Sequence, residues 1–188
     1  MLSLNKRSFN KYCVLSSLLL LSCKQSILKE ELGAFHGAHI ELMLDSMQTG
    51  FPKNDMTSIK QSQYIYVSYI DSITCTSCAL SHLSDWHALT ENISQSSFTN
   101  IFIIAPSKNE KEKVIENISK NLIDGNRIYI DTSMVFERHN PNLPKTQLAH
   151  TFLIDKDRKV ILIGDPLKNI RVEEIFNNII RNNKNKIK

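Results

Sequence analysis

The sequence is poor in cysteine, glycine, proline and tryptophan, with 4 Cys, 5 Gly, 5 Pro and 1 Trp among 188 residues. So few cysteines exclude a small scaffold built on a disulfide framework. Scarce glycine and proline exclude collagen-like and low-complexity chains. The chain does contain 41% hydrophobic and 22% charged residues, which is typical of a folded protein. Because a domain takes about 100–200 residues, the sequence predicts one globular domain.

Most of the chain also lacks an excess of charge of one sign. The formal net charge is +4, but residues 1–22 hold three basic residues and no acid. The remainder therefore carries 20 basic and 19 acidic residues, a net charge of +1. The remaining excess lies in residues 181–188, where asparagines dilute the basic side chains. This pattern favours a short solvated tail, and no nucleic-acid partner is expected.

The amino terminus has the pattern of an export signal. Residues 1–12 are basic and polar, residues 13–21 are apolar, and Ser22 and Cys23 follow. A basic segment before an apolar run of about 7–15 residues is typical of a secretory signal. The apolar run is shorter than the ~20 residues that span a bilayer.

The segment Leu20 to Cys23 resembles a bacterial lipobox, in which the signal is removed and the cysteine becomes the lipid-bearing first residue. We therefore predict a lipoprotein signal peptide at residues 1–22 and diacylglycerol and palmitate chains on Cys23. Such chains would tether the protein to a membrane outside the cytoplasm, where disulfides can form. An ordinary signal peptide and a stray apolar helix are the alternatives.

The rest of the chain alternates between strand and helix patterns. Runs rich in β-branched and aromatic residues predict strands, and apolar residues at helical spacing predict helices. The expected strands are 64–70, 101–105, 127–131, 151–154 and 160–163, with a weaker edge strand at 39–47. The expected helices are 75–90, 107–124 (stopped by Gly125), 132–139 and 170–181, the last with Ile175, Phe176, Ile179 and Ile180 facing inward. Residues 24–36 are expected to be a tether with little to pack against, and residues 50–63 a polar loop.

This order predicts an α/β fold with a mixed sheet and helices on both faces. Strands that alternate with helices pair in parallel, whereas a late hairpin pairs antiparallel. The predicted division is a signal peptide at 1–22, a tether and N-terminal extension at 23–60, a folded domain at 61–182 and a basic polar tail at 183–188.

Cys75-Thr76-Ser77-Cys78 follows a predicted strand and opens a predicted helix. The free N–H groups and partial positive charge of a helix amino terminus stabilise a thiolate. One thiolate can attack a substrate disulfide, and the second can resolve the mixed disulfide. Half of a zinc site, a static disulfide and coincidence are the alternatives, although no second cysteine pair remains for zinc.

The segments Ser72 to Cys78 and His150 to Asp155, in this order of elements, resemble the thioredoxin fold. They are most similar to the small lipid-anchored thiol–disulfide interchange proteins of Gram-negative bacteria, over about residues 60 to 182. The resemblance implies a thioredoxin-like domain that performs dithiol–disulfide exchange without a cofactor, with Cys75 as nucleophile and Cys78 as resolving thiol. It implies exported thiol- or disulfide-containing proteins as partners, and a periplasm-facing location on the inner or outer membrane or at the cell surface.

The sequence departs from the thioredoxin pattern near the expected site. Thr74 replaces the usual Trp before the first cysteine, and Tyr69 replaces an acidic or amide residue in the preceding strand. Asp71 is the nearest acid, either a proton acceptor or, as we expect, a solvated loop residue. His150 replaces the family's cis-proline. We expect His150 to lie within reach of Cys75 and Cys78, as a groove residue or a metal contact.

Two functions compete with an oxidoreductase. Copper-delivery proteins of the thioredoxin fold resemble the pattern of two cysteines and a later histidine, although their cysteines are usually three residues apart rather than two. A non-catalytic thioredoxin-like binding module would keep only a structural disulfide. His82, four residues after Cys78, could join a metal site, but a surface histidine is favoured. We assign no metal site from the sequence.

Overall fold

The computed structural model describes residues 26–49, 56–71, 83–90, 93, 97–107, 109–120 and 127–184. Within these ranges, no helix is both long and apolar enough to cross a bilayer.

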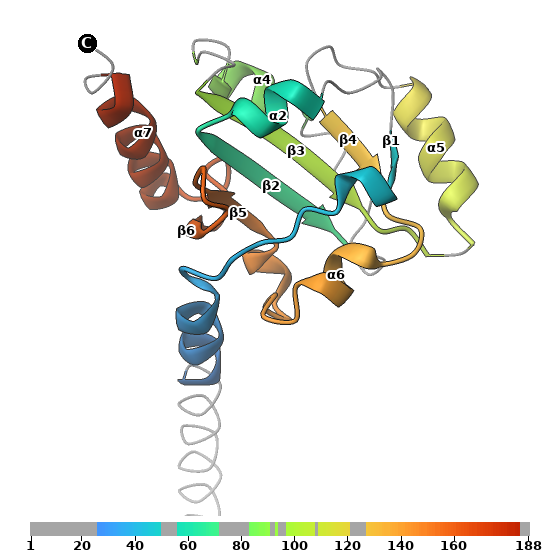
Figure 1. Ribbon diagram of the computed structural model, residues 1–188, viewed down its shortest axis with the longest axis horizontal. Coiled ribbons are helices and arrows are strands. Elements are labelled where there is room, and N and C mark those ends of the chain that lie inside the picture. Colours follow the sequence, from blue (N-terminus) through green and yellow to red (C-terminus); the bar gives the residue numbers. More distant parts are fainter. Residues whose placement is uncertain are drawn as a thin grey trace, which may run out of the picture.

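A mixed sheet lies at the centre of the described residues (Figure 1). Its strands are β1 (Gln48–Thr49), β2 (Tyr64–Ile70), β3 (Phe98–Ile104), β4 (Arg127–Ile130), β5 (Thr151–Ile154) and β6 (Val160–Ile163), in the order β1-β4-β3-β2-β5-β6. The central strands β2, β3 and β4 pair in parallel. The outer strands β1, β5 and β6 pair antiparallel. The predicted mixed α/β sheet, with its late hairpin, is confirmed.

Three helices cover one face of the sheet, which we call the α7 face. They are α4 (Leu83–Thr90), α5 (Lys111–Lys120) and α7 (Ile170–Lys184). Each buries part of an apolar stripe against the sheet: Trp86 from α4, Val114 and Ile118 from α5, and Phe176 and Ile180 from α7. Because these stripes repeat at helical spacing, the sequence pattern was sufficient to predict them.

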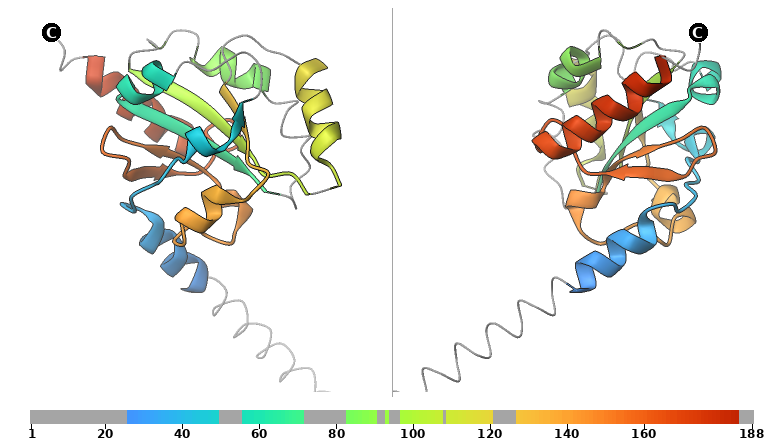
Figure 2. Two further views of the ribbon diagram at one scale, coloured as in Figure 1. Left: turned by 45° about the vertical axis from the view of Figure 1, so that its right-hand side comes forward. Right: turned by 90° about the vertical axis from the view of Figure 1, so that its left-hand side faces the viewer.

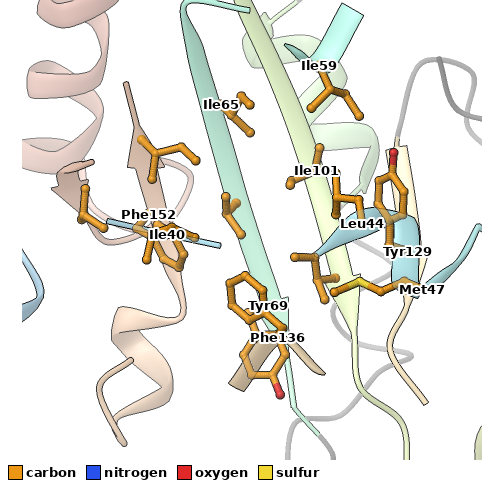
Figure 3. Close-up of a cluster of buried hydrophobic side chains, with 14 of the residues drawn as sticks. Ile40, Leu44, Met47, Ile59, Ile65, Tyr69, Ile101, Tyr129, Phe136 and Phe152 are labelled. Carbon is orange, nitrogen blue, oxygen red and sulfur yellow. The ribbon is translucent and has the colours of Figure 1, made fainter. Parts of the chain in front are cut away.

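The opposite face, which we call the α6 face, is covered by shorter pieces of chain. They are the end of the helical segment at residues 26–35, through Phe35, together with the 3-10 helix η1 (Leu44–Ser46), α2 (Met56–Gln61) and α6 (Val135–His139). Their apolar side chains, such as Leu44 and Ile59, meet alternate residues of the strands, such as Ile65 and Ile101 (Figure 3). No single amphipathic helix spans this face among the described residues.

The N-terminal segment packs more closely than we predicted. Residues 24–36 were expected to be a tether with little to contact, yet Phe35 is fully buried against Phe152, with ring centroids 5.0 Å apart. Residues 37–40 then follow the hairpin, because Gly37 and Val160 share a backbone hydrogen bond of 2.8 Å and Ile40 donates to the carbonyl of Arg158 at 2.9 Å. One aromatic ring and a short ladder therefore fix the end of this segment to the domain.

Three other predictions differ from the structure. The edge strand expected at 39–47 is instead the short β1 at Gln48–Thr49, because Met43 has a φ of 53° and starts a turn of 3-10 helix. The segment 50–63, expected to be a polar loop, contains α2, whose Ile59 is buried against the sheet. Ile175 was expected to face inward but is 48% exposed, because it lies at the edge of the α7 stripe centred on Phe176 and Ile180. Gly125 lies outside the described residues.

Candidate functional site

The Cys-x-x-Cys motif falls between β2 and α4. β2 ends at Ile70, and α4 is described from Leu83. Cys75 and Cys78 lie in between and outside the described residues, as do Thr74 and His82. Their geometry therefore stays a prediction. The same holds for lipid attachment at Cys23, which precedes the first described residue.

His150 lies beside the end of β2 that leads into the motif. It follows the 3-10 helix η2 (Gln147–Ala149) and precedes β5, and its backbone carbonyl accepts a hydrogen bond of 2.8 Å from the N–H of Tyr69. The residue is only 4% exposed. Its Nε2 is 2.8 Å from the carbonyl oxygen of Pro144. Since a carbonyl can only accept, Nε2 carries a proton and Nδ1 is the nitrogen that faces the rest of the site.

Asp71 is the group that Nδ1 faces. It is the first residue after β2, and its Oδ2 lies 3.6 Å from His150 Nδ1. The other carboxylate oxygen, Oδ1, accepts from Nε2 of Gln147 at 3.4 Å. The Asp71 side chain is largely buried, so the expectation of a solvated loop aspartate was wrong. The reason is that the loop before β5 folds back over the end of β2 and covers it.

The two side chains form a buried polar pair. Nδ1 of His150 is buried and lies 3.6 Å from Oδ2 of Asp71, which is beyond normal hydrogen-bond distance. The Asp71–His150 pair lies directly after β2, at the end of the strand that precedes the Cys-x-x-Cys motif in the sequence.

Tyr69 forms the apolar wall of the pair. Its ring packs on that of His150, with centroids 5.4 Å apart, and on that of Phe136 at 5.0 Å. Burial raises the pKa of the Tyr69 hydroxyl far above its usual value, and the carboxylates of Glu137, Asp131 and Asp71 raise it further. The phenol therefore keeps its proton at any physiological pH and does not act as an acid or base.

Asp131 is a second buried carboxylate near this end of the sheet, and sequence reasoning missed it. It is 1% exposed and follows β4. Its two oxygens accept hydrogen bonds from the N–H groups of Ser133, Val135 and Phe136 at 3.3, 2.9 and 2.8 Å. These N–H groups open α6 and have no partner within the helix. Asp131 is therefore a helix cap, and its position after a strand and before a short helix was the available signal.

The position of His150 relative to the cysteines stays a prediction. The imidazole packs on Tyr69, which belongs to the α6 face, whereas Trp86 of α4 packs on the α7 face. The ring thus lies on the α6 side of the end of β2. The chain between Asp71 and Leu83, which carries both cysteines, must pass from this end of the sheet to α4.

The remaining candidates add no metal site. His139 is exposed, and its Nδ1 lies 2.8 Å from the carbonyl of Val135, one turn earlier in α6. Within the part of the chain that the structure describes, no group of three His, Cys, Asp or Glu side chains could hold a metal ion.

Known proteins resemble this chain in structure but not in sequence. No family model matches the sequence, and no curated protein matches it. The N-terminal domain of PilB from Neisseria gonorrhoeae superposes with a TM-score of 0.50 and 17% identity, covering 68% of this chain and 83% of that one. The fold is thioredoxin-like.

Two other solved structures are also similar to this thioredoxin-like chain. A putative electron transfer protein from Aquifex aeolicus superposes with a TM-score of 0.50 and 14% identity, covering 76% of this chain and 94% of that one. The thioredoxin domain of a thiol-disulfide oxidoreductase from Bacteroides vulgatus has a TM-score of 0.48 and 12% identity, with 77% and 97% covered. Likeness at such low identity establishes the fold and nothing finer about chemistry or location.

Proposed function

We propose that this protein is a thiol–disulfide oxidoreductase that uses Cys75 and Cys78 and acts outside the cytoplasm, tethered to a membrane through Cys23. The observation that carries the proposal is the place of the motif in the fold. A Cys-x-x-Cys follows the central strand β2 of a thioredoxin-like sheet and precedes α4 on the α7 face. At the start of a helix, the first sulfur of such a motif is expected at the exposed end, where a protein substrate can reach it.

The proposed reaction transfers two electrons and balances without a cofactor. The Cys75 thiolate attacks a substrate disulfide, forms a mixed disulfide and releases one substrate thiolate, which takes up a proton. The Cys78 thiolate then attacks Cys75, releases the second substrate thiolate and leaves a Cys75–Cys78 disulfide. The substrate is reduced and the motif oxidised; the reverse sequence oxidises a dithiol substrate. Exported thiol- or disulfide-containing proteins are the expected partners.

The Asp71–His150 pair supports the proposal because it places two polar side chains close to the motif in the sequence. Asp71 precedes Cys75 by four residues. Thiol–disulfide exchange needs proton movement at each step, because only the thiolate is nucleophilic and each leaving thiolate is protonated. Carboxylate and imidazole groups are among the side chains that enzymes use for proton transfer.

Reduction of insulin disulfides by the full-length protein tests the exchange activity. We expect the wild type to be active and Cys75→Ser to lose activity, with Cys75 alkylated faster than Cys78 in the reduced protein. Cys75 should react faster because the first sulfur of a helix-opening motif lies at the exposed end. Equal, slow labelling of both thiols near pH 7, without insulin reduction, would instead identify a non-catalytic binding module with a structural pair.

The tether is tested separately from the exchange activity. Cys23→Ala should leave the precursor uncleaved by the lipoprotein peptidase, whereas wild-type protein should have an acylated Cys23 at its amino terminus. Wild-type protein recovered in the cytosol with an intact Met1 would contradict both the anchor and the location.

A second candidate function is metal handling, and one observation favours it. Histidine ligands of metals commonly donate their other ring N–H to a backbone carbonyl, which orients the ligating nitrogen. His150 does so through Nε2 and Pro144, which leaves Nδ1 directed at the site. Together with two cysteines it would make a soft or borderline ligand set suited to copper or zinc. About one copper ion bound per reduced chain, lost in His150→Ala, would support this function over exchange.

The variant His150→Pro separates the two candidates, because it restores the residue typical of the thioredoxin family. We expect it to raise dithiol exchange, since a proline there shapes the substrate groove in that family, and to weaken any metal binding. A variant indistinguishable from wild type in both assays would remove His150 from the site.

A further inference from the structure

One end of the domain carries an apolar hollow that the proposed chemistry does not use. It has a volume of about 340 Å³ and opens between residues 26–35, the loop before β5, and the turn from β6 into α7. Its apolar lining includes Leu28, Leu32, Leu148, Ile163 and Val172. Leu148 is the most exposed of the large apolar side chains described, at 81%.

The rim of this hollow collects most of the exposed large apolar residues that the structure describes. Leu28 is 38% exposed, and its neighbour Ile27 is 53% exposed. Ile170 is 67% exposed and follows Asn169, which lines the hollow. Only Met134 and Ile175 are exposed elsewhere among the described residues. Such a gathering marks an interaction surface rather than scattered surface residues.

The same end of the domain carries the N-terminal helical segment. Residues 26–35 project from the body on the side away from the C-terminal end of α7 (Figures 1 and 2). We call the set Ile27, Leu28, Leu148 and Ile170 the anchor-side surface.

We propose that the anchor-side surface lies on the lipid bilayer to which Cys23 is attached. The inference rests on the proposed acylation of Cys23. Ile27 is the fourth residue after Cys23, so their Cα atoms are at most about 14 Å apart, even in a fully extended chain. Acyl chains on Cys23 would lie in the hydrocarbon core. Ile27 and Leu28 are therefore held at the membrane interface, a depth at which amphipathic helices bury their apolar faces by about 5–10 Å.

Apolar side chains rather than charge define this surface. Lys168 lines the hollow and is exposed, but it pairs with Asp165 at 3.3 Å. Arg171 in α7 and Glu30 in the N-terminal helical segment are both exposed. Because the surface carries charges of both signs, attraction to anionic lipids does not decide the orientation of the domain. The orientation is decided by contact of Leu148 and Ile170 with the membrane interface, since both side chains would otherwise remain in water.

The orientation has a consequence for the candidate site. Gln147 lines the hollow and also donates to Asp71. The Asp71–His150 pair therefore lies at the membrane-facing end of the domain. Partners would meet this end close to the bilayer surface, rather than far out in the aqueous compartment.

Site-directed spin labelling of the mature, acylated protein tests the proposal. The background is Cys75→Ser with Cys78→Ser, so that only an introduced cysteine is labelled, and exchange activity plays no part. Labels at Leu148→Cys and Ile170→Cys are compared with a matched control at Ile175→Cys. The protein is reconstituted in protein-free vesicles of phosphatidylethanolamine and phosphatidylglycerol, and mass spectrometry verifies the acyl chains on Cys23.

We expect oxygen to relax the labels at 148 and 170 more than a water-soluble nickel chelate does, and the reverse at 175. Equal access of the nickel chelate to all three labels, in protein that carries the acyl chains, would overturn the proposal. Shielding of 148 and 170 in cell membranes but not in vesicles would also overturn it and indicate a protein partner. If Cys23 carries no acyl groups, the proposed membrane contact is overturned. The exchange activity is still tested independently by the insulin assay of the wild type.

Discussion

On the α7 face of the sheet, three helices present apolar stripes to the strands, whereas on the α6 face short helices and extended segments are joined by buried polar groups. Apart from tyrosines, the buried titratable side chains of the described residues are Asp131 and His150. Both lie on the α6 side. Asn140 is also buried there and pairs through its amide with both backbone groups of Glu41, at 2.9 Å each. One face thus depends on packing, and the other on directional hydrogen bonds between segments far apart in the sequence.

The difference explains where the candidate site can arise. The helices of the α7 face bury apolar stripes, and the buried Tyr66 hydroxyl on this face comes from the sheet and donates to the carbonyl of Gly164. Short segments leave backbone groups that need side-chain partners, and these partners bring carboxylates and an imidazole into low-dielectric surroundings. The Asp71–His150 pair is an outcome of this second kind of construction.

The largest effect is expected when one buried aromatic ring is removed from each face. Phe176→Ala should lower the free energy of unfolding by about 3–5 kcal/mol, since the ring is fully buried against Tyr66 and Phe98. Phe35→Ala should cost less, because residues 26–40 can detach locally while the sheet stays folded. Urea denaturation measures both, and limited proteolysis should show faster cleavage of residues 26–40 in Phe35→Ala alone. Equal losses of stability in the two variants, without faster cleavage of residues 26–40, would show that the two faces unfold as one cooperative unit.

This comparison also shows how much the sequence could predict. The strands β2 to β6 were predicted from runs of apolar, β-branched and aromatic residues, and the helices of the α7 face from apolar residues at helical spacing. Burial of Phe35 was not, since a single aromatic residue at the end of a polar helical segment has no period. β1 was misplaced because the left-handed backbone of Met43 depends on the sheet that the segment meets.

The site was predictable only in part. The sequence singled out His150 because it stands where the thioredoxin family has proline, and it noted Asp71 as the nearest acid. It did not reveal that the two side chains face each other, because the contact depends on how β5 pairs with β2. Nor could it identify Pro144 as the partner of Nε2, since the loop before β5 has no regular pattern.

The next expected effect compares two helix caps. Asp131→Ala should cost about 2–4 kcal/mol, because buried N–H groups at the start of α6 lose their acceptor. Asn169→Ala is the matched control on the α7 face. It caps α7 through the N–H groups of Arg171 and Val172 but is exposed, so water can replace it and the cost should be about 1 kcal/mol. Equal costs in thermal denaturation would show that burial of the cap is unimportant.

A smaller effect is expected from the partner of His150. Asp71→Ala should cost about 1–3 kcal/mol, because Nδ1 of the buried imidazole would be left facing an apolar group. Asp71→Asn should cost less, since its amide N–H can donate to Nδ1. Nitrogen NMR of the imidazole should show the proton on Nε2 in the asparagine variant, with Pro144 still as its acceptor. A ring protonated on Nδ1 alone would contradict the donor assignment.

The smallest effects compare two tyrosines of β2 that point to opposite faces, Tyr66 to the α7 face and Tyr69 to the α6 face. Burial raises the pKa of both hydroxyls, with the Asp165 carboxylate adding to the shift for Tyr66 and the three carboxylates near Tyr69 adding to its shift. The unfolded chain ionises its tyrosines near pH 10. Between pH 10 and the folded pKa values, the unfolded state therefore binds fewer protons than the folded state, and stability falls as the pH rises.

Phenylalanine at either position should flatten this alkaline decline, as measured by denaturation between pH 7 and pH 11. At pH 7 the two variants should differ. Tyr66→Phe removes the hydrogen bond of 2.5 Å to the carbonyl of Gly164 and should cost about 1 kcal/mol. Tyr69→Phe removes a buried hydroxyl that makes no hydrogen bond of normal geometry but interacts with the Glu137 carboxylate, so its cost should be smaller than that of Tyr66→Phe. If the stability of both variants falls as steeply with pH as that of the wild type, the alkaline sensitivity comes from groups other than these two tyrosines. Equal losses at pH 7 would show that the Tyr69 hydroxyl is as well bonded as that of Tyr66, and would bring it into the polar network of the α6 face.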